Sequence, residues 1–349
     1  MRWLLLPFMC LYGLVTGLRN FFFTKGWLRS FEFDFPVILV GNLSAGGTGK
    51  TPHIEYLIRL LKSSYKVATL SRGYKRTYTG FGIATELSRV EDIGDEPKQY
   101  KQKFPDIEVA VSIDRVGGIY QVLHDEPQTQ VILLDDGFQH RRLRAGLNIV
   151  LTTFQKPFYD DYLMPVGRLR ETRAGKNRAQ VIIVTKCPFD ITVEQQQEIM
   201  KKIGPQNDRQ VFFTTLKYEA LYPLFADQDI SLEITKPVMV TGIAGNKDMF
   251  AHVSTMYTDI TKMSFADHHY YSVSDIKRIK ERGDTIITTE KDAMRLMEQK
   301  EAILANGLKV FVLPVEVVFI NKADVFEKLV LDFIVQSTPS PTETTVSNE

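Results

Sequence analysis

The sequence predicts an α/β protein in which a parallel sheet carries helices on both faces and a second α/β domain is present. Short apolar runs rich in valine and isoleucine alternate with helical patterns along most of the chain, which is typical of parallel sheets. The chain has 349 residues, more than one hydrophobic core usually serves, so two domains are expected. A glycine-rich loop between the first of these runs and a helix indicates that the first sheet binds a nucleotide.

Composition limits the classes of partner. A hydrophobic content of 44% with 24% charged residues is that of a folded globular protein. The net charge is +1, and no cluster of basic and aromatic residues suggests a base-reading surface, so nucleic acid is not expected as a partner. The two cysteines, Cys10 and Cys187, provide neither a disulfide framework nor a metal-ligand cluster, which fits a reducing cytosol.

Residues 1–30 are expected to associate with a membrane. Residues 3–18 carry no charge, basic residues flank and follow them, and the first acidic residue is Glu32. This run is interrupted by Pro7 and is shorter than the roughly 20 residues of a spanning helix. We therefore expect a segment that lies on the membrane, with aromatic side chains in the interface and basic ones near anionic head groups. A secretory signal and a helix packed on the protein's own core are the alternatives.

The stretch at residues 41–52 is expected to hold nucleotide phosphates, because it joins the apolar run 37–40 to a helical pattern. Its glycines can turn backbone N–H groups towards the β- and γ-phosphates, Lys50 supplies positive charge, and the Thr51 hydroxyl can bind Mg²⁺. Ser44 stands where the usual motif begins with glycine, and a glycine-rich turn without a ligand is the alternative. The first sheet is therefore predicted to be of the P-loop NTPase type. The predicted nucleotide-binding residues here are Ser44, Ala45, Gly46, Gly47, Thr48, Gly49, Lys50 and Thr51.

Polar residues follow further apolar runs at residues 67–70, 109–111, 131–134 and 149–151. Ligands of parallel sheets bind at the carboxyl ends of the strands, so these positions are candidate site residues. Arg72 and Lys75 could hold a phosphate of an acceptor or belong to a solvated basic loop. Asp95 opens a helical stretch and could be its cap. The roles of Arg115 and His140 stay open.

Asp135 and Asp136 directly follow the buried run at residues 131–134. A carboxylate at the end of a strand beside a phosphate loop is the Walker B arrangement, which holds Mg²⁺ directly or through water. The sequence therefore predicts a magnesium site here, against a plain strand-ending turn. Glu171 could complete the magnesium shell, although its charged surroundings could equally be a solvated run.

A second alternation begins near residue 181, with apolar runs at residues 181–184, 211–214, 238–241 and 285–288. We assign residues 31–153 to the nucleotide-binding domain and residues 154–304 to the second α/β domain with its linker. Residues 305–335 could return to the first sheet. Residues 336–349 are rich in serine, threonine and proline and are expected to be disordered.

Asp267, His268 and His269 lie together after an aromatic residue in this second part of the chain. No pattern of cysteine, histidine or glutamate around them makes a zinc site. Two neighbouring histidines on a loop suggest either acid–base chemistry or surface exposure.

Several motifs occur in a fixed order along the chain. They are Gly41-Asn42-Leu43-Ser44 with Gly49-Lys50-Thr51-Pro52, then Gly94-Asp95-Glu96-Pro97, Asp135-Asp136-Gly137-Phe138-Gln139-His140, Leu169-Arg170-Glu171, Asp267-His268 and Thr289-Glu290-Lys291-Asp292. Together they resemble the motifs of the tetraacyldisaccharide 4'-kinases, the lipid A kinases. The resemblance runs from the N-terminal segment to about residue 320 and includes Ser44. Thr172 departs from it, because proline is expected there in many relatives.

The resemblance implies a kinase that uses ATP and Mg²⁺. It would transfer the γ-phosphate to the 4'-hydroxyl of a tetraacylated glucosamine disaccharide 1-phosphate, in lipid A biosynthesis at the cytoplasmic face of the bacterial inner membrane. It also implies two α/β domains joined by a thin linker, with the nucleotide between them, and it adds no protein partner.

The same resemblance implies roles for single residues. Asp95 would be the general base with His268 as its partner, and Gln139 would lie near the phosphates. Mg²⁺ would be bound by Asp135, Asp136 and Glu171.

Two rival functions are open from the residues alone. The loop also fits the deviant P-loop of membrane-tethered ATPase switches, although Ala45 stands where those proteins carry a signature lysine. A GTP-binding module is the second, because Thr185 and Lys186 match the first two positions of the guanine-reading motif N/T-K-x-D. Pro188 stands where that motif has its aspartate.

Overall fold

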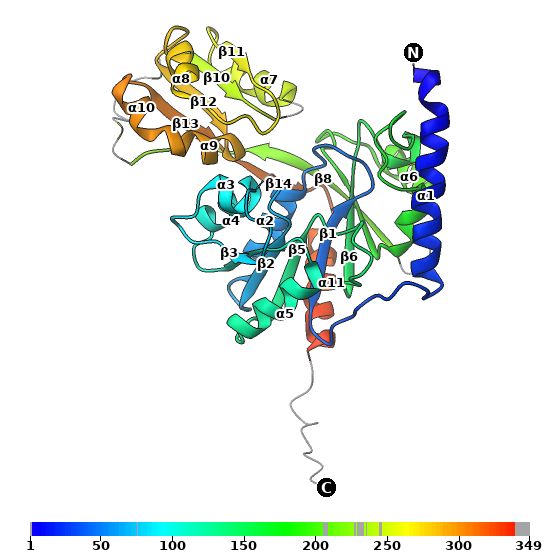
Figure 1. Ribbon diagram of the computed structural model, residues 1–349. Helices are drawn as coiled ribbons and strands as arrows, with labels where there is room; N and C mark the ends of the chain where they lie inside the picture. The colour runs from blue at the N-terminus through cyan, green and yellow to red at the C-terminus, as the bar shows by residue number, and fades with distance from the viewer. Residues whose placement is uncertain are drawn as a thin grey trace.

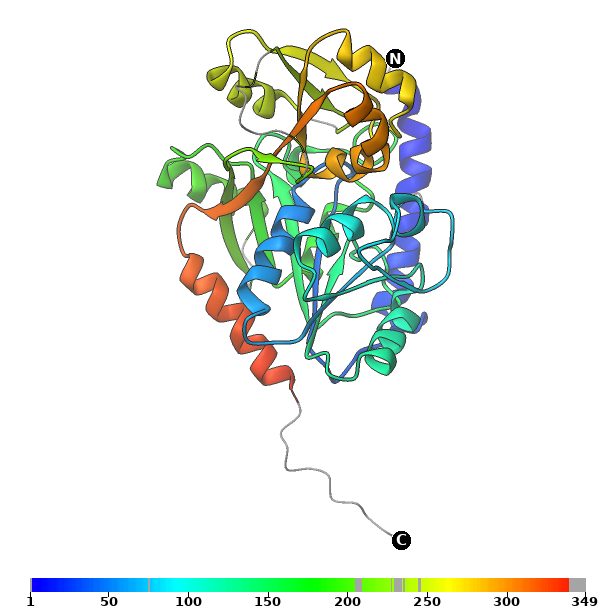
Figure 2. The ribbon, with the colours of Figure 1, turned by 90° about the vertical axis from the view of Figure 1, so that its left-hand side faces the viewer.

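The computed structural model describes residues 2–74, 76–204, 209–226, 228, 234, 236–243 and 246–338, with side chains from residue 4 onwards. Its strands form a nine-stranded sheet, the large sheet, and a five-stranded sheet, the small sheet. Figures 1 and 2 show the small sheet stacked beyond one end of the large sheet, with one long N-terminal helix along the side of the molecule. Lys75 and most of the predicted disordered tail lie outside the described residues.

The large sheet has the order β14-β8-β7-β6-β1-β5-β2-β4-β3. Seven neighbouring strands from β8 to β4 pair in parallel, and only the edge strands β14 and β3 pair antiparallel. The predicted parallel sheet is therefore confirmed. Its strands are β1 (Val37–Asn42), β2 (Val67–Ser71), β3 (Gly82–Ile83), β4 (Glu108–Val111), β5 (Val131–Asp135), β6 (Leu147–Thr153), β7 (Val181–Thr185), β8 (Gln210–Tyr218) and β14 (Val315–Phe319).

Helices cover both faces of the large sheet. One apolar cluster joins one face of the strands to α2 (Lys50–Leu61), α4 (Asp95–Lys103) and α11 (Ala323–Ser337). A second cluster joins the other face to α5 (Arg115–Asp125) and α6 (Val193–Ile203). Because both faces are buried, the central strands can be apolar at every position, which is why they are continuous runs in the sequence. A short helix, α3 (Val90–Ile93), precedes α4.

The small sheet has the order β11-β10-β12-β13-β9 and is parallel except at β9. Its strands are β9 (Tyr222–Pro223), β10 (Pro237–Thr241), β11 (Thr261–Ser264), β12 (Thr285–Thr289) and β13 (Lys309–Leu313). Its helices are α7 (Lys247–Met256), α8 (Val273–Lys280), α9 (Glu290–Leu296) and α10 (Lys300–Ala305).

The sheets divide the chain differently from the expected boundary at residue 154. Strands β7 and β8 extend the large sheet, although their apolar runs were assigned to the second domain. An apolar run looks the same whichever sheet it joins, so composition does not assign it. Residues 305–335, expected as a possible return to the first sheet, are divided at Pro314, which separates β13 in the small sheet from β14 in the large sheet. The antiparallel pair of β8 and β14 thus lies where the chain passes between the sheets.

The N-terminal helix α1 (Leu6–Thr24) is longer than the uncharged run, because it continues through Arg19 and Asn20. By length and composition alone, it is the one helix of the described residues that could cross a membrane, and only 6% of it is buried. The alternative of a helix packed in the protein's own core is therefore not what the structure shows. Its inner side is polar, since the Tyr12 hydroxyl donates to the Arg170 carbonyl at 2.7 Å.

Candidate active site

A cavity of about 1110 Å³ lies between the carboxyl end of the large sheet and the small sheet, and α1 forms part of its wall. Most of the residues predicted for the site line it. They are Gly46, Gly47, Thr48, Gly49, Lys50, Thr51, Asp135, Asp136, Gln139, Glu171 and His268. Ser44 and Ala45 do not; they instead bridge to the strand-like segment at Leu169 and Arg168. The cavity therefore gathers strand ends that are far apart in the sequence.

Hydrogen bonds from neighbouring side chains hold the phosphate loop in place. Gly49 directly precedes α2 and has a φ of 88°. Glycine adopts this left-handed backbone conformation without strain. The Asn42 side chain donates to the Thr48 hydroxyl at 2.9 Å, and the Thr185 hydroxyl donates to the Thr48 carbonyl at 2.8 Å. His53 Nδ1 donates to the Gly49 carbonyl at 2.7 Å, because a carbonyl oxygen only accepts. Burial lowers the pKa of His53 to about 4, so this support is neutral at physiological pH.

The two aspartates at the end of β5 differ in environment. Burial raises the pKa of Asp135 to about 6, and the Tyr100 hydroxyl donates to its Oδ2 at 2.9 Å. Asp136 lies 3.6 Å from the Lys50 ammonium and receives a hydrogen bond of 3.0 Å from Arg170. Burial alone would raise the pKa of Asp136, but the charges of Lys50 and Arg170 outweigh it and lower the pKa. Asp136 therefore stays ionised beside the phosphate loop.

The donors at this point fit a magnesium ion that is shared with a nucleotide. Asp135 Oδ1 is buried and has no hydrogen-bond partner among the described residues, and Thr51 and Asp136 line the same cavity. Within the described part of the chain, no three acidic, histidine or cysteine side chains are close enough to hold a metal by themselves. Mg²⁺ usually keeps waters and phosphate oxygens in its shell and takes only one or two carboxylates, which suits this set.

Glu171 lies in a network that ties three segments together. Its carboxylate receives two hydrogen bonds from Arg178, at 2.8 and 2.9 Å, and one from Asn20 of α1 at 3.1 Å. Gln139 donates to it at 3.0 Å and also to the Asn42 carbonyl at the end of β1. The Glu171 oxygens are thus engaged by three side chains, and a magnesium role would require Glu171 to exchange these partners.

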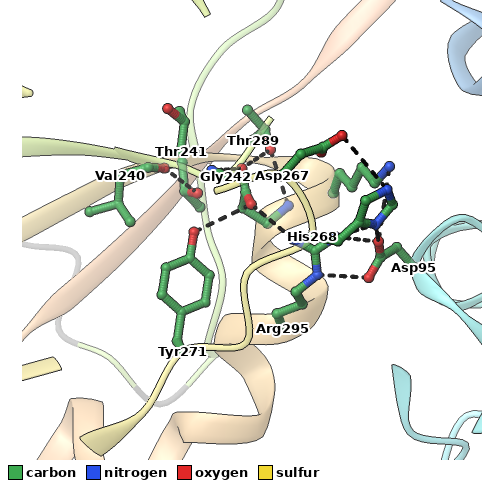
Figure 3. A network of polar contacts seen from close by, with 12 residues as sticks. Asp95, Val240, Thr241, Gly242, Asp267, His268, Tyr271, Thr289 and Arg295 are labelled. Atoms are coloured by element: carbon green, nitrogen blue, oxygen red, sulfur yellow. Dashed lines mark hydrogen bonds and ion pairs between the residues drawn. The ribbon is translucent and has the colours of Figure 1, made fainter. Parts of the chain in front are cut away.

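Asp95 and His268 meet across the contact between the two sheets (Figure 3). Asp95 opens α4, after Gly94 with a φ of 93°, while His268 lies in the loop after β11 with a φ of 61°. His268 Nδ1 lies 2.6 Å from Asp95 Oδ2. The Arg295 Nε donates to Asp95 Oδ1 at 2.7 Å. The two residues are 173 positions apart, so no local pattern in the sequence indicated their contact. Only the family resemblance implied it.

The charge state of Asp95 determines the tautomer of His268. Burial would raise the pKa of Asp95, but hydrogen bonds from His268 and Arg295 and the positive charges of Arg295 and Lys291 lower it to about 2. An ionised carboxylate only accepts, so His268 Nδ1 donates to it, and a neutral imidazole in this tautomer has its lone pair on Nε2. His268 lines the cavity, whereas Asp95 does not. Of this pair, His268 is therefore the residue that a bound ligand can reach.

Sequence reasoning missed the cations that organise this site. Arg178 holds Glu171, and Arg295 and Lys291 hold the acidic start of α4. Lys291 and Arg295 are four residues apart in the chain, which places them on one face of a helix. Lys291 belongs to the Thr289-Glu290-Lys291-Asp292 motif, and a second cation four residues after it, Arg295, was the available signal.

Comparison with known proteins agrees with this geometry. The model of one protein family, described as tetraacyldisaccharide-1-P 4'-kinase, matches residues 1–334. The chain belongs to this family. The family predicted from the motifs is thereby confirmed.

Relatives in this kinase family are similar over nearly their whole length. The tetraacyldisaccharide 4'-kinase of Flavobacterium johnsoniae is 46% identical over 340 residues, covering 96% of this chain and 97% of that one. That of Bacteroides thetaiotaomicron is 44% identical, covering 97% and 94%. A crystal structure of LpxK from Aquifex aeolicus in complex with ATP is 31% identical, with a TM-score of 0.74, and covers 95% of this chain and 99% of that chain.

The depressed pKa of Asp95 predicts a pH-dependent contribution to stability. Because the pKa is lower in the folded state, the contribution is present above about pH 4 and is lost as the pH falls towards 2. The shift corresponds to about 2 kcal/mol at neutral pH, of which about half is lost near pH 3. Urea unfolding of the wild type and Asp95→Asn from pH 6 to 3 should show a shrinking difference in the free energy of unfolding. A constant difference would contradict the ion pair, and the exposed Asp190→Asn is the control.

Proposed function

We propose that this chain is an ATP-dependent lipid kinase that phosphorylates the 4'-hydroxyl of a tetraacylated glucosamine disaccharide 1-phosphate. The observation that carries the proposal is that a phosphate loop, strand-end aspartates and a histidine base open into one cavity beside an apolar helix. The names of the family and of its relatives support this substrate class. The ATP complex of the Aquifex aeolicus protein supports ATP as the donor.

The large sheet is proposed to hold the nucleotide. The backbone N–H groups of the loop from Gly46 to Gly49 and the Lys50 ammonium would bind the β- and γ-phosphates. The Thr51 hydroxyl, Asp135 and Asp136 would hold Mg²⁺, which neutralises the charge that develops on the phosphate oxygens. Arg170 contacts Asp136 and Gln139, so it fixes the position of both side chains.

His268 Nε2 is proposed to take the proton of the acceptor hydroxyl. As the hydroxyl oxygen forms its bond to the γ-phosphorus, the bond to the leaving oxygen of ADP breaks, and the proton passes to Nε2. Asp95 then stabilises the imidazolium through Nδ1 and keeps the ring oriented. This division places the reacting nitrogen on His268 and makes Asp95 its partner, whereas the family resemblance implied the reverse order.

Three arginines and a histidine in the wall of the cavity support an anionic acceptor. Arg19, Arg72, Arg115 and His140 line the cavity. Arg115 Nε and His140 Nε2 are buried and have no hydrogen-bond partner among the described residues. Burial of a guanidinium without a full set of partners is costly, so these groups favour a bound anion such as a phosphate.

The helix α1 is proposed to lie flat on the membrane. Its outer face carries Phe8, Leu11, Val15 and Leu18, which recur at helical spacing and are 48–63% exposed. Its inner face is held by the site, because Arg19 donates to the Gln139 carbonyl and Asn20 to Glu171. A spanning orientation would surround this polar face with lipid, whereas a flat one buries only the apolar face. Lipid acceptor and nucleotide would then meet at the cytoplasmic surface of the inner membrane.

A transfer assay tests the proposed function. Full-length protein is incubated with Mg²⁺ and γ-labelled ATP, with and without a lipid A disaccharide 1-phosphate precursor, and label is sought in the lipid. Label at the 4'-position supports the kinase. Hydrolysis of ATP with dimerisation that does not depend on lipid would overturn it in favour of a membrane-tethered ATPase switch.

Loss of the phosphate or metal contacts should abolish transfer. We expect Lys50→Ala and Asp136→Ala each to lower kcat on the order of a thousandfold or more, as for other single elements of phosphoryl transfer. Lys62→Ala, which removes an exposed lysine paired with Asp106, is the control. Near-normal turnover by folded Asp136→Ala would place the metal elsewhere.

Asp95 and His268 should act as one unit. Because either change alone disables the base, the double variant Asp95→Ala/His268→Ala should be scarcely slower than either single variant. Single-turnover rates at saturating ATP provide the measurement. Losses that multiply would show two independent roles.

The outer face of α1 should determine binding to membranes. The double variant Leu11→Glu/Val15→Glu places two charges in the apolar face and leaves the inner contacts of Tyr12 and Asn20 intact. We expect it to stop sedimenting with anionic phospholipid vesicles while it still binds a fluorescent ATP analogue. Val335→Glu, at an equally exposed valine of α11, is the control. Full sedimentation of the double variant would move the membrane contact to another surface.

A further inference from the structure

We propose that Arg295, on α9, is a positioning residue that holds Asp95 in place and ionised so that His268 keeps its free nitrogen towards the cavity. This inference rests on the proposed kinase function. Arg295 comes from the small sheet's side of the molecule, whereas Asp95 comes from the large sheet's side. The base is then complete only where α4 and α9 pack against each other.

The contacts of Arg295 are those of a two-pronged clamp. Its side chain is 1% exposed, and its Nε and Nη2 contact the two separate oxygens of Asp95. Nη2 also lies 3.2 Å from His268 Nδ1. A guanidinium only donates and binds a carboxylate with two parallel hydrogen bonds, so it sets both the position and the rotation of Asp95. Asp95 in turn sets the tautomer of His268.

Arg295 is itself anchored by Asp292, one turn earlier in α9. Arg295 Nη1 donates to Asp292 Oδ1 at 3.4 Å. Asp292 is fully buried and receives hydrogen bonds from the Gly242 backbone N–H at 3.0 Å and from the Thr289 hydroxyl at 2.9 Å. Gly242 and Thr289 end or follow strands β10 and β12, so the clamp is fixed to the carboxyl end of the small sheet (Figure 3).

Further ion pairs link α9 to α4. Lys291 lies 2.6 Å from Glu96, and Lys103 contacts Glu290. These pairs place α9 along α4 whether or not Arg295 is present. Arg295 differs from them because it touches both members of the base, and its buried charge acts on the proton that they share.

The positive charge of Arg295 disfavours the addition of a second proton to the Asp95 and His268 pair. Among the described residues, the charged groups that contact His268 are Asp95 from α4, Arg295 from α9 and Asp267 from its own loop, and the ring of Tyr74 packs against the imidazole. One step further out, Lys291 of α9 reaches Asp95 and Glu96 of α4. Without Arg295, the charged groups left in contact with the ring would be the carboxylates of Asp95 and Asp267. The Asp95 and His268 pair would then bind a proton more tightly, because a nearby cation had disfavoured the imidazolium.

The pH profile of kcat tests this role. Replacing the charge with Arg295→Gln should move the acid limb of the profile upwards by about one pH unit, since removing a nearby cation shifts titration by that order. We expect kcat at pH 7 to fall about tenfold or more, part of the roughly hundredfold to ten-thousandfold that a positioned base contributes. The KM for ATP should stay within about twofold. Arg295→Lys keeps the charge, so its acid limb should stay near that of the wild type while kcat falls.

Control variants keep the test decisive. Arg278→Gln removes a cation of α8 that pairs with Asp275, and it should leave the profile unchanged. If Arg295→Gln does not fold because Asp292 has lost its partner, Asp292→Asn/Arg295→Gln removes both charges and gives the same comparison. An unchanged acid limb in the glutamine variant, or an equal shift in the lysine variant, would overturn the inference. Absence of transfer by the wild type would instead reject the kinase function.

Discussion

The register between β1 and β5 is the constraint on which the site depends. Val40 pairs with Asp135, so the phosphate loop after β1 and the acidic pair after β5 leave the sheet side by side. Side chains alternate between the two faces of a strand, and a slip of one residue would turn Asp135 to the other face. Close packing maintains the register, because a Cβ at Gly41 would lie 2.6 Å from the Cβ of Phe138. Lys50 and Asp136 are brought within ion-pair distance by the same pairing.

The second part of the site is assembled by charge across the contact of α4 with α9. Buried charges are costly to desolvate and are tolerated where opposite charges and hydrogen bonds compensate them. Asp95 and Arg295 satisfy that condition together, and Asp292 holds the guanidinium from the other side. The arrangement also fixes the position of the His268 ring, because His268 Nδ1 lies 2.6 Å from Asp95 Oδ2. Asp95 and His268 therefore come together only when both sheets are in place.

The helix α1 connects the site to its surroundings. Its polar side contributes Tyr12 and Asn20 to the network around Arg170 and Glu171, while its apolar side faces away from the protein. One helix therefore both completes the wall of the cavity and presents an apolar surface beside it. A lipid acceptor that lies in a membrane plane would reach the cavity along this helix.

The sequence by itself determined the local features, because glycine spacing, strand-ending carboxylates and apolar periodicity are properties of short segments. These indicated the phosphate loop, Asp135 and Asp136, the parallel sheet and the apolar N-terminal segment, and the ordered motifs identified the family. Only the tertiary structure decided which sheet β7, β8 and β14 join, since equally apolar runs fit either sheet. It also decided that Arg178 engages Glu171 and that Arg295 reaches Asp95, 200 residues away in the chain. Contacts between distant segments depend on how whole elements pack, and no short stretch of sequence carries that information.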